Sequence, residues 1–197
     1  MARRRTWEII LCTFIVVIPV GAIIFFFAVL FRERILERRY QEPIARAAAR
    51  YRIDPLLVKA VIWQESGFNA QARGKAGEIG LMQIMDLTAE EWAQAEKLKD
   101  FKHEHLFEPT RNIHAGAWYL SKLLKRYTNC DNALPYALAD YNAGRTHVLR
   151  WTKGRAATNS AQFLAQMDFP GTRKYALSVI HRYEYYQRHE GTSWAGK

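Results

Sequence analysis

The sequence has 197 residues, of which 49% are hydrophobic and 24% charged, with 11 Gly, 6 Pro and 2 Cys. This composition excludes a collagen-like, disordered or low-complexity chain, and two cysteines are too few for a disulfide-stabilised scaffold. The formal net charge of +10 favours anionic partners, although the basic residues are scattered among acidic ones.

The first predicted element is an apolar helix over residues 9–31. These 23 residues carry no charge and would extend roughly 34 Å as a helix, against a hydrocarbon core of about 30 Å. Trp7 lies at one edge, where an indole suits the membrane interface. A cleaved signal peptide is the alternative, but its apolar core spans roughly 7–15 residues and ends at small residues, whereas this segment ends at Phe31. We therefore predict a retained transmembrane anchor over 7–31.

Helix signals recur through the rest of the chain, while no strand pattern or hairpin signal stands out. An alanine-rich segment predicts a helix over 42–51. Asp54 then supplies an N-cap, and Pro55 suits the first turn of the next helix. Apolar residues four and eight positions before Glu65 place this carboxyl group on an apolar face of that helix.

Further helices are predicted in the second half of the chain. A capping box opens one at Thr88, and Pro109 begins a long one. Asp131 or Asn132 caps the next helix, which Gly144 ends. The last two predicted helices span 160–167 and 172–189.

These elements predict a single all-α domain on a membrane stem, because no internal repeat and no second domain boundary is found. The anchor is preceded by a cytoplasmic N-terminus at 1–6. A juxtamembrane stem at 32–43 joins it to the domain at 44–190. A short tail at 191–197 follows.

The stretch from Trp63 to Met85 is the most informative about chemistry. Glu65 comes near the end of an apolar helix, and burial of a carboxyl group disfavours its charged form and raises its pKa. A carboxylic acid that stays protonated near neutrality can protonate a leaving oxygen. The following loop contains Gly67, Gly74 and Gly77, which leave room for a ligand. The alternative is a glutamate that ends a helix and faces water.

Several blocks of residues occur in a defined order. Glu65-Ser66 comes first, residues 80–83 read Gly-Leu-Met-Gln, and residues 141–144 read Tyr-Asn-Ala-Gly. These blocks resemble motifs of the soluble-type lytic transglycosylases. Segments around 112–120 and 172–175 resemble two further blocks of that family. The resemblance extends over about 44–179.

The resemblance implies an all-α, goose-lysozyme-like fold and a reaction on peptidoglycan. The family cleaves the β-1,4 bond between N-acetylmuramic acid and N-acetylglucosamine and forms a 1,6-anhydromuramic acid end. Glu65 would be the proton donor and then the base that activates the C6 hydroxyl. By position, the candidate substrate-binding residues are Ser66, Met82, Gln83, Tyr141, Asn142 and Tyr175. Either tyrosine would bond the Glu65 carboxyl group or the sugar, while a core methionine is the alternative for Met82.

The chain departs from the family pattern at several positions. Gly74, Asp86, Asp140 and Gly171 stand where the family usually has serine, proline, alanine and glutamate. Glu78 stands where alanine is common, 13 positions after Glu65. Glu78 has three interpretations: a solvated loop residue, a brace that accepts backbone N–H bonds, or a second carboxylate that positions water.

The last interpretation of Glu78 would make the protein a muramidase, a hydrolase that uses Glu65 with Glu78 or Asp140. An alternative of another class is a non-catalytic protein that binds the cell wall or assists its assembly. The segment His103-Glu104-His105 lacks the spacing of a helical zinc pair. We predict no metal and no cofactor.

The predicted partners are peptidoglycan strands and the bacterial cytoplasmic membrane, the latter through residues 9–31. Basic residues flank both ends of this segment, so charge does not decide its orientation. Peptidoglycan lies outside the cytoplasm, which predicts a single-pass protein with its domain on the periplasmic side. A membrane stem and scattered charge argue against a nucleic-acid binder.

Overall fold

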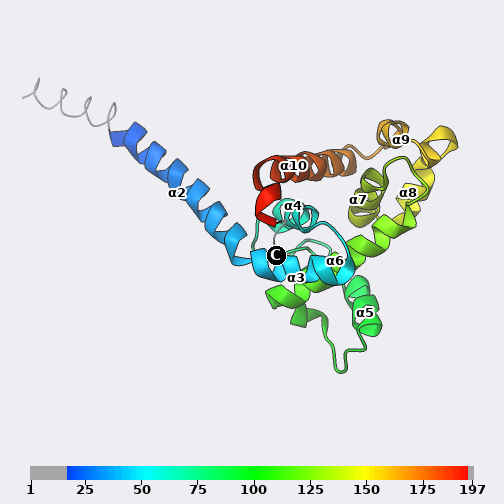
Figure 1. Ribbon diagram of the computed structural model, residues 1–197, viewed down its shortest axis with the longest axis horizontal. Coiled ribbons are helices and arrows are strands. Elements are labelled where there is room, and N and C mark those ends of the chain that lie inside the picture. The colour runs from blue at the N-terminus through cyan, green and yellow to red at the C-terminus, as the bar shows by residue number, and fades with distance from the viewer. Residues whose placement is uncertain (1–16, 195–197) are drawn as a thin grey trace, which may run out of the picture. The chain divides into compact units, whose positions relative to one another are not determined.

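The computed structural model describes residues 17–194, and the chain divides into two units, Met1–Arg39 and Tyr40–Lys197. The described helix of the first unit is α2 (Ile18–Arg39) (Figure 1). Its sequence is apolar up to Phe31 and rich in charged residues after it. The large apolar side chains of this unit that are exposed are Val17, Ile18, Val20, Ile23, Ile24, Phe25, Phe26, Phe27, Phe31 and Ile35.

The predicted transmembrane anchor over 7–31 is not confirmed. Within residues 17–194, no helix has both the length and the apolar character required to cross a membrane. Residues 7–16 of the predicted anchor, together with the predicted N-terminal segment at 1–6, lie outside the described residues.

The second unit is built from helices and loops, which confirms the all-α prediction. Its described residues form no β-strand, only isolated bridges of Ile79 with Arg73 and Ile84. The helices are α3 (Gln41–Tyr51), α4 (Pro55–Ser66), α5 (Asp86–Ala95), η2 (His103–Phe107), α6 (Pro109–Arg126), α7 (Ala133–Ala143), α8 (Arg145–Trp151), η3 (Gly154–Ala157), α9 (Ser160–Gln166) and α10 (Pro170–Trp194).

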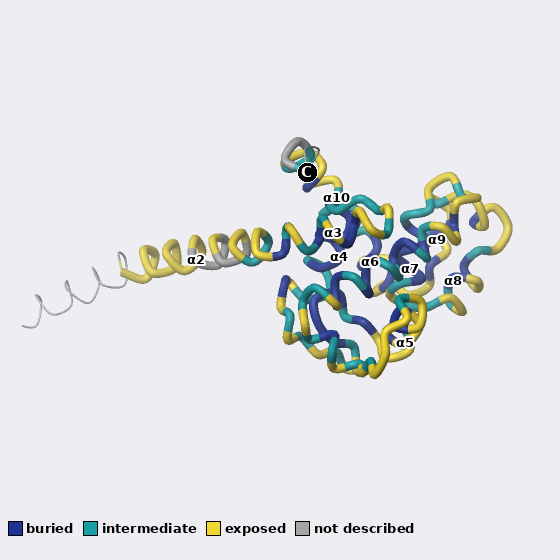
Figure 2. Tube along the Cα trace, turned by 60° about the horizontal axis from the view of Figure 1, so that its bottom comes forward, coloured by how far each residue is buried: buried dark blue, intermediate teal, exposed yellow. Residues whose placement is uncertain are grey.

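The helices of this unit pack around α4, α6 and α7. Helix α10 lies along α4 and α7, and α6 lies against α3 and α7 (Figure 1). Buried segments concentrate in the middle of the unit, and exposed ones in its peripheral loops (Figure 2). The packing of α10 against α4 matters most for function, because it brings the C-terminal helix to Glu65.

Most predicted helix ends are confirmed. The Asp54 carboxylate accepts the Leu56 N–H at 2.8 Å and caps α4. The Asn132 side chain caps α7, which ends at Gly144. The capping box at Thr88 is wrong, because α5 already begins at Asp86, where an acidic first-turn residue suits the helix dipole.

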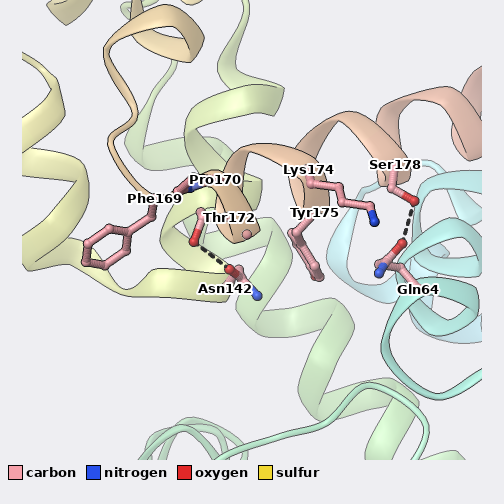
Figure 3. A pocket seen from close by; sticks show the side chains of 9 residues that line it. Gln64, Asn142, Phe169, Pro170, Thr172, Lys174, Tyr175 and Ser178 are labelled. Atoms are coloured by element: carbon pink, nitrogen blue, oxygen red, sulfur yellow. Dashed lines mark hydrogen bonds between the residues drawn. The ribbon is translucent and has the colours of Figure 1, made fainter.

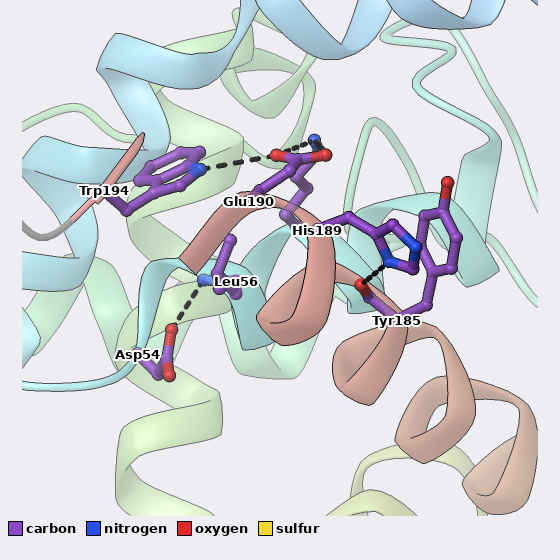
Figure 4. A network of polar contacts seen from close by, with 7 residues as sticks. Asp54, Leu56, Tyr185, His189, Glu190 and Trp194 are labelled. Atoms are coloured by element: carbon purple, nitrogen blue, oxygen red, sulfur yellow. Dashed lines mark hydrogen bonds and ion pairs between the residues drawn. The ribbon is translucent and has the colours of Figure 1, made fainter. Parts of the chain in front are cut away.

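Polar contacts hold α10 against α4 along its length. The Lys59 ammonium group contacts both carboxylate oxygens of Glu190 at 2.7 and 2.8 Å. Trp194 donates its indole N–H to the same carboxylate (Figure 4). The Tyr183 hydroxyl donates to Asp54 at 2.7 Å. Helix α10 extends to Trp194, so residues 191–194 of the predicted tail belong to this helix. Residues 195–197 of the predicted tail lie outside the described residues.

Candidate active site

Glu65 lies in the last turn of α4, just before the helix ends at Gly67 in a left-handed conformation with φ of 55°. Its carboxyl group is partly buried, and burial raises its pKa from the ordinary value of 4.5 to about 7. A hydrogen bond from Tyr175 acts in the opposite direction, and the charge of Glu78 raises the pKa further. The burial of Glu65 agrees with a desolvated acid at this position, and a pKa near 7 keeps much of the group protonated at neutral pH.

Two tyrosines predicted for the site have different partners. Tyr175 comes from α10 and donates its hydroxyl hydrogen to Oε1 of Glu65 at 2.5 Å. Tyr141 comes from α7 and donates to the backbone carbonyl of Met82 at 2.8 Å. Burial, and then the charge of Glu65, raise the pKa of both hydroxyls well above 10. Both therefore remain protonated donors, and Tyr175 is the one that contacts the Glu65 carboxyl group.

Asn112 organises the loop that follows Glu65, a role that the sequence analysis missed. Its side chain is fully buried, accepts the Met82 N–H at 2.7 Å and donates to the carbonyls of Ile79 and Leu106 at 2.9 Å each. Gly80 has φ of 80°, and a Cβ there would overlap the Asn112 side chain. The match at 112–120 was the available signal, although it did not indicate which loop the asparagine would hold.

The Gly-Leu-Met-Gln block is mainly structural in this chain. Met82 is fully buried and packs so closely on Gly116 that a Cβ at this glycine would overlap the Met82 side chain. The structure therefore supports the alternative interpretation of Met82, a core methionine, and not a contact with a sugar. Ser66 donates its hydroxyl to the Leu81 carbonyl at 2.8 Å. Gln83 is partly buried with φ of 48° and donates its amide to the Gly80 carbonyl at 2.9 Å.

A cavity of about 730 Å³ lies beside Tyr175 (Figure 3). At one end, Thr172 donates its hydroxyl to the side-chain oxygen of the exposed Asn142 at 2.8 Å. At the other end, Ser178 donates to the side-chain oxygen of Gln64 at 2.5 Å. The lining residues are Gln64, Asn142, Phe169, Pro170, Gly171, Thr172, Lys174, Tyr175 and Ser178. Of the predicted substrate-binding residues, Asn142 and Tyr175 line this cavity.

Glu78 braces its own loop. Its carboxylate accepts the Ala76 N–H at 2.8 Å, and its backbone carbonyl accepts the Gly74 N–H at 2.7 Å. A Cβ at Gly74 would overlap the Glu78 carboxylate. The two departures at positions 74 and 78 therefore fit each other sterically. These contacts favour the second interpretation of Glu78, a backbone brace.

Asp140 is held inside the helix bundle. Its side chain is 1% exposed, contacts the Arg126 guanidinium at 2.6 Å and accepts the Tyr127 hydroxyl at 2.6 Å. Because both partners engage the same carboxylate oxygen deep in the core, this geometry does not support Asp140 as a second carboxylate of the site. His103 places Nε2 2.8 Å from the Ile84 carbonyl and is likewise a structural residue.

Comparison with known proteins gives a consistent picture. Residues 42–164 match the family described as Transglycosylase SLT domain. A putative soluble lytic murein transglycosylase of Haemophilus influenzae is 33% identical over 155 residues, which cover 77% of this chain and 25% of that protein. A membrane-bound lytic murein transglycosylase F of Desulfosudis oleivorans is 37% identical over 123 residues, which cover 60% of this chain and 25% of that protein.

Solved structures show the same likeness. An inactive glutamate-to-glutamine mutant of lytic transglycosylase Slt from Pseudomonas aeruginosa aligns with a TM-score of 0.68 and 28% identity, covering 76% of this chain and 24% of that one. The 70-kDa soluble lytic transglycosylase of Escherichia coli aligns with a TM-score of 0.69 and 27% identity, covering 77% and 24%. The chain thus spans about a quarter of the length of these relatives.

Proposed function

Because this chain belongs to the transglycosylase SLT domain family, we propose that it is a peptidoglycan lytic transglycosylase. It cleaves the β-1,4 bond between N-acetylmuramic acid and N-acetylglucosamine and leaves a 1,6-anhydromuramic acid end. The single observation that carries the proposal is Glu65, a partly buried acid with a pKa raised to about 7. An acid with this pKa can give up a proton at neutral pH.

The reaction needs one carboxyl group used twice. Protonated Glu65 donates its proton to the glycosidic oxygen, the bond from this oxygen to C1 of the muramic residue breaks, and the sugar develops oxocarbenium character. The resulting carboxylate takes the proton of the C6 hydroxyl, whose oxygen attacks C1 and closes the anhydro ring. No water is consumed, so no second carboxylate is required, unlike in two-carboxylate glycosidases. The attack within one sugar avoids an entropic cost of up to ~7–11 kcal/mol.

Tyr175 supports both steps as a positioning residue. Its hydroxyl donates to Oε1 of Glu65, which orients the carboxyl group and stabilises the carboxylate formed after the first proton transfer. Asn142 and Gln83 are proposed to bind sugar hydroxyl or acetamido groups. Ser66 and Tyr141 are proposed to act through the loop at 79–83, because their hydroxyls donate to its backbone carbonyls.

Product analysis tests the proposal. The full chain in detergent is incubated with isolated peptidoglycan, and the released muropeptides are analysed by mass spectrometry. We expect 1,6-anhydromuramic ends. Reducing ends, heavier by one water, would instead identify the hydrolase alternative. Binding of the wall without any release would support the non-catalytic alternative.

The pH dependence of the rate follows from the pKa of Glu65. The group must be protonated to act as an acid, so kcat/KM is expected to fall as pH rises through about 7. Initial rates of muropeptide release between about pH 3.5 and 9 measure this. A falling limb near 4.5, the ordinary pKa of a glutamate, would show that burial does not tune this group.

We also propose that residues 9–31 attach the protein to the cytoplasmic membrane, with the helical unit on the periplasmic side, where its substrate lies. The support is the uncharged run of 23 residues and the exposed apolar side chains of α2, since contiguous apolar surface of this kind calls for a lipid or protein partner. Relatives named as membrane-bound are consistent with this.

Cell fractionation tests the attachment. The full chain is expected in the membrane fraction, to resist washing with salt and to be released by detergent. Deletion of residues 1–31 should move the protein to the soluble fraction. Release of the full chain by salt alone would indicate an electrostatic association instead.

A further inference from the structure

The cavity beside Tyr175 carries one charged side chain, Lys174. Its other lining residues are neutral, and Gly171 stands where the resembling family usually has glutamate. Lys174 is exposed, and within the described part of the chain no acidic side chain forms an ion pair with it. The cavity therefore has a net positive charge.

The two amides of the cavity are oriented as hydrogen-bond donors. The side-chain oxygen of Asn142 accepts from Thr172, and that of Gln64 accepts from Ser178. Each amide oxygen is thus engaged by a neighbouring hydroxyl, which leaves the NH₂ groups to face a ligand. In Figure 3 the ammonium group of Lys174 lies between Tyr175 and the Gln64–Ser178 pair.

The ammonium group of Lys174 and the amide donor of Gln64 lie at the same end of the cavity. Together they favour an anionic ligand there, and a carboxylate in particular. The two sugars of a peptidoglycan strand differ in this respect. N-acetylglucosamine is uncharged, whereas muramic acid carries a lactyl group that ends in a carboxylate or in a peptide with carboxylates of its own. The cavity of about 730 Å³ is within the usual range for sites that hold a ligand of this size.

We propose that Lys174, with the amide of Gln64 at the same end of the cavity, binds a carboxylate on the muramic acid substituent. This inference rests on the proposed function and adds to it a residue that sets substrate register. Tyr175 follows Lys174 in the chain and contacts Glu65, so a carboxylate held by Lys174 places the muramic residue rather than its uncharged neighbour near the acid.

The test compares Lys174→Gln and Lys174→Arg with wild type on three glycan substrates: peptide-bearing strands, peptide-free strands with a free lactyl carboxylate, and peptide-bearing strands whose carboxylates are amidated with methylamine. Lys174→Gln is expected to raise KM about five- to tenfold on carboxylated strands with kcat changed less than twofold. Lys174→Arg keeps the charge and should stay close to wild type. The first two substrates distinguish a stem carboxylate from the lactyl one.

The amidated strands decide the proposal. Wild type and Lys174→Gln should have the same KM on them, and Lys125→Gln, which removes an exposed lysine outside the cavity, should match wild type on every substrate. A rise in KM for Lys174→Gln that is equally large on amidated strands would overturn the proposal. The absence of any rise in KM on all three substrates would overturn it too.

Binding of the same strands is also measured in the Glu65→Gln background, where cleavage is blocked. If Lys174→Gln weakens binding of carboxylated strands but not of amidated ones in this background, the role of Lys174 is supported even when wild type releases no anhydro product. Failure of this inference is therefore distinguishable from failure of the proposed activity.

Discussion

Replacement of Glu65 with glutamine is expected to reduce the rate of muropeptide release by about three orders of magnitude. General acid–base catalysis by one positioned group contributes roughly 10²–10⁴-fold, and Glu65 acts here in both proton transfers. Glutamine has nearly the same shape, and its amide oxygen can still accept the Tyr175 hydroxyl that now bonds Oε1. The loss should therefore appear in kcat, while binding of peptidoglycan is retained.

The matched control for this substitution is Glu90→Gln, which alters an exposed glutamate on α5 and should leave the rate unchanged. Both variants are assayed by release of soluble muropeptides. A Glu65→Gln rate within tenfold of wild type would mean that another group protonates the leaving oxygen.

The same variant should be more stable than wild type at alkaline pH. The folded-state pKa of Glu65 is raised from 4.5 to about 7, so between these pH values the native state binds more protons than the unfolded state. The free energy of unfolding of wild type therefore falls as pH rises from 4.5 to 7 and then levels off. The Glu65→Gln variant has no carboxyl group to ionise at this position. Its free energy of unfolding should therefore exceed that of wild type by up to about 3 kcal/mol at pH 8. Urea denaturation at pH 5 and pH 8 measures the difference.

Asn112→Ala is expected to have the largest effect on stability, a loss of about 3 kcal/mol in the free energy of unfolding. The substitution leaves the Met82 N–H and the carbonyls of Ile79 and Leu106 without the partner that they now have. Each buried polar group left unsatisfied costs about 1–3 kcal/mol. Activity should also fall, because the freed loop carries the carbonyls to which Ser66 and Tyr141 donate.

Asn159→Ala is the matched control for Asn112→Ala. Asn159 is exposed and caps α9 by accepting the Gln162 N–H, so its loss should cost about 1 kcal/mol. Chemical denaturation of both variants at one pH compares them. An Asn112→Ala variant within 1 kcal/mol of wild type would show that water or a shift of the loop replaces the lost hydrogen bonds.

The all-α content and the helix ends near the site were predictable because their signals are local, whereas the lysozyme-like fold was predicted from the resemblance of the motifs to those of a known family. Asp54 before Pro55 and Asn132 at the start of α7 act on backbone groups two residues away. The likeness to solved lytic transglycosylases agrees with the order of motifs. The prediction of a helix start at Thr88 failed because α5 begins two residues earlier, at Asp86, with Met85 as its N-cap and no capping side chain.

The substrate-binding residues were less predictable than the acid. A motif that contains Met82 does not reveal whether its side chain meets a sugar or the core. Gly116, which accommodates the Met82 side chain, lies on α6, 34 residues further along the chain. Asn112 was part of a recognised block, yet its partners at positions 79 and 82 are 33 and 30 residues away. Such contacts depend on how helices pack and not on spacing along the chain.

The sequence by itself determined that Glu65 ends an apolar helix, since hydrophobic periodicity, the N-cap and the glycine that follows all act within a few residues of it. The tertiary structure alone decided what surrounds that carboxyl group. Tyr175, 110 residues further along the chain, reaches Oε1 because α10 packs along α4. The pKa of Glu65 rises because this packing removes water from the carboxyl group, and desolvation depends on every element that approaches it.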